Sequence, residues 1–298
     1  MQRCASVKTI CNTMAECCCS SIKNKDGLTV FTRSWMKDKC NPKAVLFISH
    51  GVTEHCGRFH KLATILQEND YAVYGHDHVG HGNSDGERIH IDDYQTYVTD
   101  VIQHVELLKS KHPNLPLFIY GESMGGLITA MTVVERPDLF TGVIFSAPAI
   151  VNVNVGFFKY YVLKVVSYFA PHHIVLPYVP KIITSDPEEV KGLIDDSLIC
   201  QDGLKAKWSL ATLDAQYKVQ QRIPEIQLPF ITLHGSKDRV VDIVSSHFLM
   251  DHAKSEDKMM KVFEGSRHTL LHDIHKEEAT QVVLEWLNKH CNKDASKL

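Results

Sequence analysis

A serine between glycines, placed between an apolar strand and a helix, constrains this chain more than any other stretch. The sequence there runs Leu115-Pro-Leu-Phe-Ile-Tyr-Gly-Glu-Ser-Met-Gly-Gly126. Leu117–Tyr120 form an apolar run of strand length, and Leu127–Met131 continue at helical spacing. In such a G-x-S-x-G turn, a strained serine presents its hydroxyl above the sheet. The stretch therefore predicts Ser123 as a nucleophile.

Further apolar runs alternate with helical patterns along the chain. Continuous apolar runs are expected where a strand is buried on both faces of a parallel sheet. Strands that alternate with helices at this spacing predict a doubly wound, mostly parallel sheet, and residues 25–298 are expected to form one such domain. The predicted elements are buried strands at Ala44–Ile48, Tyr71–Tyr74, Gly142–Ser146, Pro229–Leu233 and Met259–Phe263, an edge strand at Leu28–Trp35, and helices around 59–67, 94–108 and 277–288.

The stretch from about 149 to 220 interrupts this alternation and predicts an inserted helical cap. Gly156–Phe169 consists mainly of Phe, Tyr, Val and Leu, and its polar side chains Lys159, Lys164 and Ser167 fall within about 140° of a helical wheel. Two interpretations fit this wide apolar face. The helix is either sandwiched in the core or is a lid that covers an apolar pocket and contacts lipid with its outer side.

The cysteines are concentrated at the amino terminus, where five of the nine fall in the first nineteen residues. An odd total with three adjacent cysteines argues against a secreted disulfide scaffold, and no apolar run resembling a secretory signal opens the chain. We therefore expect a cytoplasmic protein whose residues 1–24 form a disordered tail. Cys17, Cys18 and Cys19 are candidates for S-acylation, which would tether the tail to a membrane.

Composition gives no evidence for nucleic-acid or metal chemistry. The net charge of −3 provides no basic footprint for a nucleic acid. His76, His78 and His81 lie in a glycine-rich loop, but no cysteine or carboxylate pair accompanies them at a zinc-ligand spacing. The sequence thus favours a tight loop there and predicts neither a metal nor a cofactor.

A serine nucleophile needs a general base and a carboxylate that orients it, and in this fold they follow the serine in the order Asp or Glu, then His. Asp238 directly follows the predicted strand at 229–233, and His268 directly follows the strand at 259–263. Both are therefore expected at the carboxyl edge of the sheet, near Ser123. His272, four residues after His268, remains a competitor, whereas Asp242 starts a predicted helix and fits less well.

Acyl transfer also requires N–H groups that hold the developing oxyanion. In this fold one donor is the residue after the nucleophile, here Met124. The second comes from a loop after an earlier strand, where Val52 follows His50-Gly51. The sequence therefore predicts the backbone N–H groups of Val52 and Met124 as an oxyanion hole.

From about Gly27 to His290 the chain resembles the monoacylglycerol lipases, which are serine hydrolases with the α/β-hydrolase fold. The resemblance implies Ser123, Asp238 and His268 as a catalytic triad and an apolar acyl channel beneath the cap. It also implies a small polar pocket for glycerol near Glu54, Arg58 and His272. The blocks that carry it are His50-Gly-Val-Thr-Glu-His-Cys-Gly-Arg58, His76-Asp-His-Val-Gly-His-Gly-Asn-Ser-Asp-Gly-Glu-Arg88, Gly121-Glu-Ser-Met-Gly-Gly126 and Ser197-Leu-Ile-Cys-Gln-Asp-Gly-Leu204.

Three departures affect the headgroup pocket. Glu122 precedes the nucleophile where the vertebrate enzymes have histidine, and a tyrosine of some members is replaced near Leu193. His272 follows His268 by four residues instead of three. An ionised Glu122 would disfavour an anionic headgroup, unless its side chain points into the sheet.

These observations predict an enzyme that hydrolyses monoacylglycerols to fatty acid and glycerol through an acyl-enzyme, with peripheral membrane contact through the cap. A lysophospholipase or broader carboxylesterase on the same triad is the main alternative. A catalytically silent lipid-binding protein and an acyltransferase are further alternatives.

Overall fold

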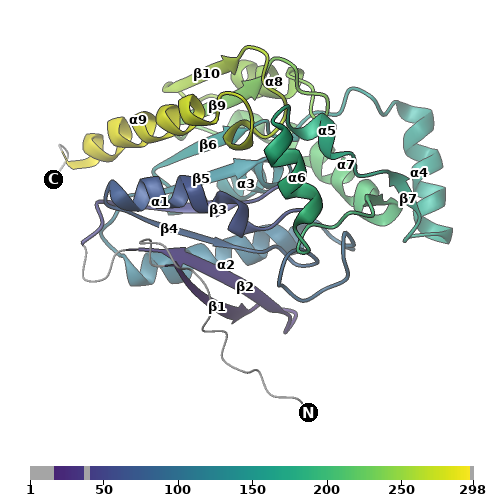
Figure 1. Cartoon of the computed structure of the whole chain (residues 1–298), viewed down its shortest axis with the longest axis horizontal. Helices are drawn as coiled ribbons and strands as arrows, with labels where there is room; N and C mark the ends of the chain where they lie inside the picture. The colour runs from purple at the N-terminus through teal and green to yellow at the C-terminus, as the bar shows by residue number, and fades with distance from the viewer. Residues whose placement is uncertain (1–16, 37–40, 296–298) are drawn as a thin grey trace.

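A computed structural model describes residues 17–36 and 41–295 of the chain. Its centre is an eight-stranded sheet in the order β1-β2-β4-β3-β5-β6-β9-β10, shown in Figure 1. From β4 to β10 all neighbours pair in parallel, while β1 and β2 are antiparallel additions. The predicted doubly wound, mostly parallel sheet is confirmed. The strands are β1 (Cys17–Lys23), β2 (Thr29–Trp35), β3 (Ala44–Ser49), β4 (Tyr71–His76), β5 (Leu117–Glu122), β6 (Gly142–Ser146), β9 (Phe230–Gly235) and β10 (Lys258–Phe263).

Helices cover both faces of the sheet, so the chain has two hydrophobic cores. Along β3, Val45 and Phe47 pack into the core beneath α2 (Gln95–Lys111), α3 (Met124–Glu135) and α8 (Val244–His252). The alternate residues Leu46 and Ile48 pack into the core beneath α1 (His60–Glu68) and α9 (Lys276–Ala295). Because both faces of each strand are buried, the central strands are continuous apolar runs, as the sequence indicated.

The elements of a helical insertion between β6 and β9 lie together on one side of the molecule in Figure 1. We call residues 149–220 the cap. Its elements are α4 (Phe157–Phe169), β7 (Ile174–Leu176), α5 (Pro180–Ile183), α6 (Pro187–Asp195), β8 (Leu204–Lys205) and α7 (Ala206–Gln220).

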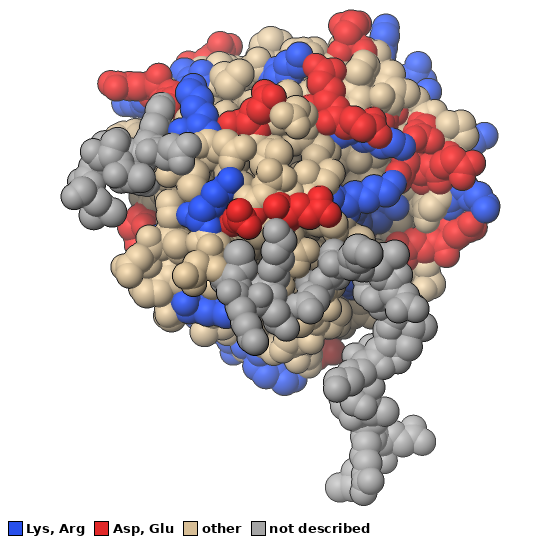
Figure 2. Space-filling model, turned by 60° about the vertical axis from the view of Figure 1, so that its left-hand side comes forward, with Lys and Arg blue, Asp and Glu red and all other residues tan. Residues whose placement is uncertain are grey.

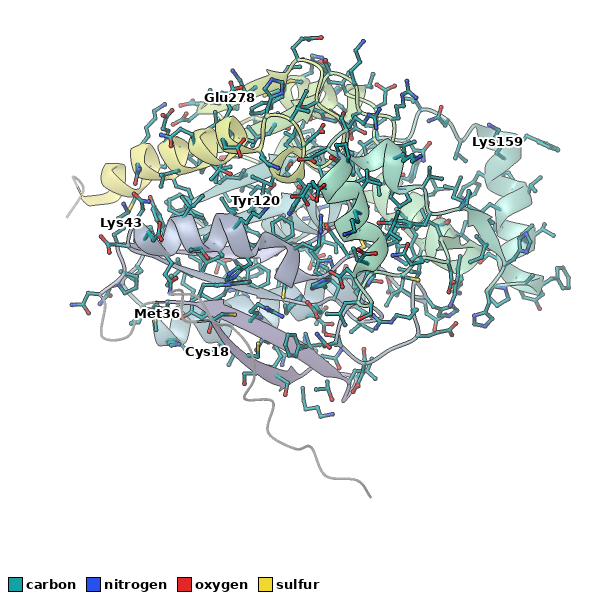
Figure 3. The ribbon with its side chains drawn as sticks, viewed as in Figure 1. Cys18, Met36, Lys43, Tyr120, Lys159 and Glu278 are labelled. Carbon is teal, nitrogen blue, oxygen red and sulfur yellow. The ribbon has the colours of Figure 1, made fainter. Side chains whose placement is uncertain are left out.

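Helix α4 is not sandwiched in the core, so that interpretation of its wide apolar face is wrong. Phe157, Phe158 and Phe169 are 78–81% exposed, and only Ser167 of this helix is buried. The Tyr160 hydroxyl donates a hydrogen bond to Asp214 Oδ1 on α7 at 2.8 Å. The helix therefore packs on α7 through one narrow, partly polar face. Figure 3 shows it projecting at the outer edge of the molecule.

The amino-terminal prediction needs correction. Residues 17–23 form β1, which pairs with β2 along its whole length, so β1 and not β2 is the edge strand. Backbone hydrogen bonds to β2 order this segment even though its sequence, CCCSSIK, lacks the apolar alternation of a typical strand. Residues 1–16 of the predicted tail lie outside the described residues.

On the face shown in Figure 2, acidic and basic side chains are interspersed over the described residues. Among these residues, no helix is long and apolar enough to cross a membrane.

Candidate active site

Ser123 lies in the turn between β5 and α3, in a strained conformation with φ of 54° and ψ of −115°. Its N–H donates to the carbonyl of Ser146 at 2.9 Å, which anchors the turn to β6. A Cβ at Gly125 would lie 2.0 Å from the carbonyl oxygen of Ser49. The glycine is therefore required by the close approach of α3 to β3, which explains the sequence pattern around the serine.

Asp238 and His268 meet through a direct hydrogen bond. His268 Nδ1 lies 2.7 Å from Asp238 Oδ2, and the carboxylate is almost completely buried. The backbone N–H groups of Val240 and Val241 donate to Oδ1 at 2.8 and 3.0 Å, and His234 Nε2 lies 3.2 Å from Oδ2. Burial alone would raise the pKa of Asp238, but His268 and His234 lower it well below its ordinary value. Asp238 is thus held as an anion that fixes the orientation of the His268 ring.

Ser123 and His268 line the same cavity, which extends under the cap. The hydrolase core contributes Gly51, Val52 and Glu54 to its wall. The cap contributes mainly apolar side chains, namely Pro177, Tyr178, Val179, Ile182, Ile183, Leu193 and Leu204. Thus Ser123 and His268, two of the three residues predicted as a triad, line one apolar pocket, and the third, Asp238, is hydrogen-bonded to His268.

The loop that carries Val52 is held from two sides. The Gly51 N–H donates to Glu54 Oε1 at 2.7 Å, and His50 Nδ1 lies 2.7 Å from the Gly51 carbonyl oxygen. That carbonyl and the Val52 N–H belong to one planar peptide unit, so these contacts fix the direction in which the Val52 N–H points. His50 was not predicted as a site residue. The sequence signal that could have indicated this role is its position directly before Gly51, in the loop that carries the predicted oxyanion donor Val52.

Behind this loop lies a network of buried histidines. The His78 backbone N–H donates to His50 Nε2 at 2.9 Å, and the His78 and His76 rings approach to 3.2 Å. His76 Nδ1 in turn lies 3.3 Å from His104 Nδ1 on α2. Burial lowers the pKa of His50 to about 3 and that of His104 to about 4. These histidines are therefore neutral at pH 7 and act as hydrogen-bonding parts of the core.

We predict that the neutral network makes the protein sensitive to acid. The unfolded chain protonates His104 near pH 6.5, whereas the folded protein does so only near its lowered pKa of about 4. Neutral His104 therefore contributes its full share to the free energy of unfolding above pH 6.5. This share is lost as the pH falls to about 4, by about 1.4 kcal/mol for each pH unit. Denaturant unfolding of His104→Gln should show a shallower pH slope of the unfolding free energy over this range. Equal slopes in both proteins would contradict the prediction.

One group of possible metal ligands occurs among the described residues. Glu87, His90 and His172 place ligand atoms within 4.8 Å of one another. However, Lys205 Nζ and His172 Nδ1 lie 2.7 and 2.8 Å from Glu87 Oε1. A lysine ammonium already compensates the carboxylate, so we assign the group as an ion-pair link between the cap and the hydrolase core.

The predicted headgroup residues are separated by the structure. Glu54 lines the Ser123 cavity, whereas Arg58 and His272 line a neighbouring cavity beside α1 and α9. Arg58 Nη2 lies 3.3 Å from Glu189 Oε2, and His272 Nε2 lies 2.9 Å from the Arg58 carbonyl oxygen. Burial lowers the pKa of His272 to about 4. Among the described residues, the walls of the Ser123 cavity include Glu54 but neither Arg58 nor His272. The role of these two residues at the headgroup stays a prediction.

The comparisons with known proteins agree with this geometry. The chain matches the family described as serine aminopeptidase, S33, over residues 40–275. It is 39% identical over 269 residues to the monoglyceride lipase of Homo sapiens, covering 89% of this chain and 87% of the relative. It is 30% identical over 266 residues to the monoacylglycerol lipase of Mycolicibacterium smegmatis, covering 89% of this chain and 94% of the relative.

Solved structures show the same fold. The monoacylglycerol lipase of Paleococcus ferrophilus superposes with a TM-score of 0.78 at 26% identity, over 88% of this chain and 99% of that chain. A soluble variant of the Saccharomyces cerevisiae monoglyceride lipase, solved with a substrate analog, gives a TM-score of 0.80 at 23% identity, over 97% of this chain and 99% of that chain.

The fold and the serine turn define this chain as a serine hydrolase with the α/β-hydrolase fold. The sheet order, the elbow at Ser123 and the cap insertion all match that class. The chain belongs to the serine aminopeptidase S33 family, with the monoglyceride lipases as its relatives, as the resemblance in sequence predicted.

Proposed function

We propose that this protein hydrolyses monoacylglycerols to fatty acid and glycerol, with Ser123, Asp238 and His268 as its triad. The observation that carries the proposal is the shared cavity of Ser123 and His268, because an apolar cap covers it and Asp238 holds the histidine. The similarity to monoglyceride lipases over most of the chain supports the substrate class.

The chemistry follows from the geometry. His268 accepts the Ser123 hydroxyl proton as the oxygen attacks the ester carbonyl, and Asp238 stabilises the imidazolium that forms. The N–H groups of Val52 and Met124 hold the oxyanion, and His268 then protonates the departing glycerol oxygen. A water molecule activated by the same histidine hydrolyses the acyl-enzyme, which releases the fatty acid and restores the serine.

A substrate comparison tests this function. Monoacylglycerols, lysophospholipids and short-chain esters are assayed with the wild-type protein, and kcat/KM is expected to be highest for monoacylglycerols. A preference for lysophospholipids, or equal rates on all three classes, would support the lysophospholipase or carboxylesterase alternative instead. Transfer of the acyl group to added alcohols in place of water would indicate an acyltransferase.

We further propose that α4 contacts the membrane surface that holds the substrate. Its exposed aromatic side chains suit insertion into the headgroup region of a membrane. Replacing Phe158 and Phe169 with serine is expected to weaken sedimentation with phospholipid vesicles by about tenfold or more, from the apolar area lost. Leu107→Ser is the matched control, because Leu107 is 49% exposed on α2, outside the cap. Equal loss in both variants would contradict a specific role of α4.

S-acylation at Cys17, Cys18 and Cys19 is a second proposed route to a cytoplasmic membrane surface. All three lie on the edge strand β1, where Cys18 and Cys19 are exposed and so accessible to a modifying enzyme. Hydroxylamine-sensitive palmitate labelling, lost when the three cysteines are replaced by serine, tests this. Labelling that persists in the triple variant would place the modification elsewhere.

A further inference from the structure

A chain of buried polar side chains lies behind the carboxylate of Asp238. The Thr232 hydroxyl on β9 lies 2.9 Å from the Ser246 hydroxyl on α8, which lies 2.8 Å from His234 Nδ1. On the other side of the ring, His234 Nε2 lies 3.0 Å from the Val241 carbonyl oxygen and 3.2 Å from Asp238 Oδ2. Thr232, His234 and Ser246 are completely buried. The chain therefore leads from the interior between β9 and α8, which lie side by side in Figure 1, to the Asp238 carboxylate.

The contacts determine which nitrogen of the His234 ring carries a proton. The Val241 carbonyl oxygen can only accept a hydrogen bond, and the same is true of the ionised Asp238 carboxylate. Nε2 is therefore protonated, and its N–H is shared between these two oxygens. Nδ1 instead faces the Ser246 hydroxyl, which can donate to it. The orientation of the ring is thus specified from both sides.

Packing alone does not explain why these side chains are polar. Thr232 and His234 lie on the same face of β9 as Phe230, which belongs to the hydrophobic core beneath α8. Apolar side chains fill such a buried site at lower cost than polar ones. The face becomes polar only toward the carboxyl end of the strand, and the charged neighbour there is Asp238. Because each member of the chain is hydrogen-bonded, the chain can hold that carboxylate rigidly.

We infer that His234 is a positioning residue of the catalytic triad, whose Nε2–H holds the Asp238 carboxylate and the loop that carries it. This inference rests on the proposed function, since it requires Asp238 to orient His268. Two backbone N–H groups hold Asp238 Oδ1, and about these bonds the carboxylate can still pivot and turn Oδ2 away from His268. The His234 N–H opposes this motion and also ties the Val241 carbonyl of the same loop to β9. The triad geometry is thereby held from the rigid sheet.

The same N–H affects how readily the Asp238–His268 pair takes up a proton. The pair carries one negative charge when His268 is neutral and none when it is protonated, and a hydrogen bond to the carboxylate favours the more negative state. Without the donor, neutral His268, which the reaction needs, is therefore lost at a higher pH. His234 from β9 and Glu54 from the loop after β3 face this pair, and α8 contributes the uncharged Ser246. Glu54 is kept in every variant below, so its effect is common to all of them.

Two substitutions of similar size separate the N–H from the volume of the ring. His234→Met fills the site without a donor, and kcat for a monoacylglycerol is expected to fall about tenfold on the pH plateau. The midpoint of the acid limb of kcat/KM should also move to higher pH by about one unit. His234→Gln supplies an amide N–H and is expected to keep most of kcat and the wild-type midpoint. KM should change little in both variants, because His234 lies outside the walls of the Ser123 cavity.

His247→Met and His247→Gln are the matched controls. His247 is exposed on α8, directly after Ser246 in the sequence, and it also lies outside the cavity walls. Both control variants should keep the wild-type kcat and the wild-type pH profile. Thermal unfolding establishes that each variant is folded.

A measurement on the unaltered protein decides the inference even if His234→Met does not fold. NMR of protein with isotope-labelled histidine reports which ring nitrogen carries a proton, and the His234 signals are assigned by their loss in His234→Gln. We expect a protonated Nε2. An unprotonated Nε2 in the folded protein overturns the inference, because it cannot donate to the carboxylate.

The kinetic outcomes separate this inference from the proposed function. If His234→Met keeps the wild-type kcat and midpoint while Asp238→Asn strongly lowers hydrolysis, His234 has no positioning role and the triad stands. A loss of equal size at every pH that His234→Gln does not rescue shows a packing role and also overturns the inference. Hydrolysis that survives in Asp238→Asn overturns the triad, and this inference with it.

Discussion

Replacing Ser123 by alanine is expected to lower ester hydrolysis by about 10⁴-fold or more and to abolish labelling by fluorophosphonate probes. The reason is that the acyl-enzyme forms on the Ser123 oxygen, and the remaining oxyanion contacts and substrate binding provide only a small residual rate. Rates are measured with monoacylglycerol and with a short-chain ester, so that loss of the nucleophile is separated from loss of lipid binding.

The matched control is Ser110→Ala. Ser110 is exposed on α2, where its hydroxyl donates to the Glu106 carbonyl at 3.1 Å, and it lies outside the cavity walls. This variant should keep wild-type activity and labelling. Ser123→Ala should keep a cooperative unfolding transition, because the substitution removes one oxygen. Full activity of a folded Ser123→Ala protein would disprove the assignment of the nucleophile.

Asp238→Asn is expected to lower kcat by about 10⁴-fold while the protein stays folded. An asparagine amide can donate a hydrogen bond to His268 Nδ1, which selects the ring tautomer whose Nε2 carries a proton and cannot accept one from Ser123. The amide also cannot compensate the charge of the imidazolium. Steady-state kinetics and the rate of fluorophosphonate labelling should therefore fall together.

Asp242→Asn is the control for this change. Asp242 is an exposed residue of the same loop, whose Oδ1 accepts the Val244 N–H at the start of α8. It is the nearest alternative carboxylate in the sequence and should tolerate the amide with little change in kcat. If Asp242→Asn caused the larger loss, the carboxylate of the triad would have been misassigned.

The sequence predicted the parts of this protein that depend on local patterns. The central strands are predicted well because burial on both faces requires continuous apolar runs. Asp238 and His268 were predicted as partners of Ser123 because each directly follows a strand, and parallel strands end at one edge of the sheet. In the structure their side chains share a hydrogen bond of 2.7 Å.

The errors concern features that only the assembled fold determines. β1 was missed because its backbone pairing with β2, and not its side chains, orders it. The orientation of α4 was left open because an apolar helix has the same pattern in a core or at a lipid surface. The place of His272 depends on a contact that is distant in sequence, because it bonds to the Arg58 carbonyl oxygen and lines the neighbouring cavity.

The cap lies between two strands, β6 and β9, that are direct neighbours in the sheet. Its own two ends are adjacent, because Gln220 Nε2 at the end of α7 donates to the Ile150 carbonyl oxygen at 2.9 Å. Lengthening or exchanging a loop whose ends are already adjacent changes little in the rest of a fold. Ser123, Asp238 and His268 lie outside the inserted segment. Substrate range and hydrolytic chemistry can therefore evolve separately, and a cap transplanted from a relative at these two strands should change which ester is cleaved without changing how it is cleaved.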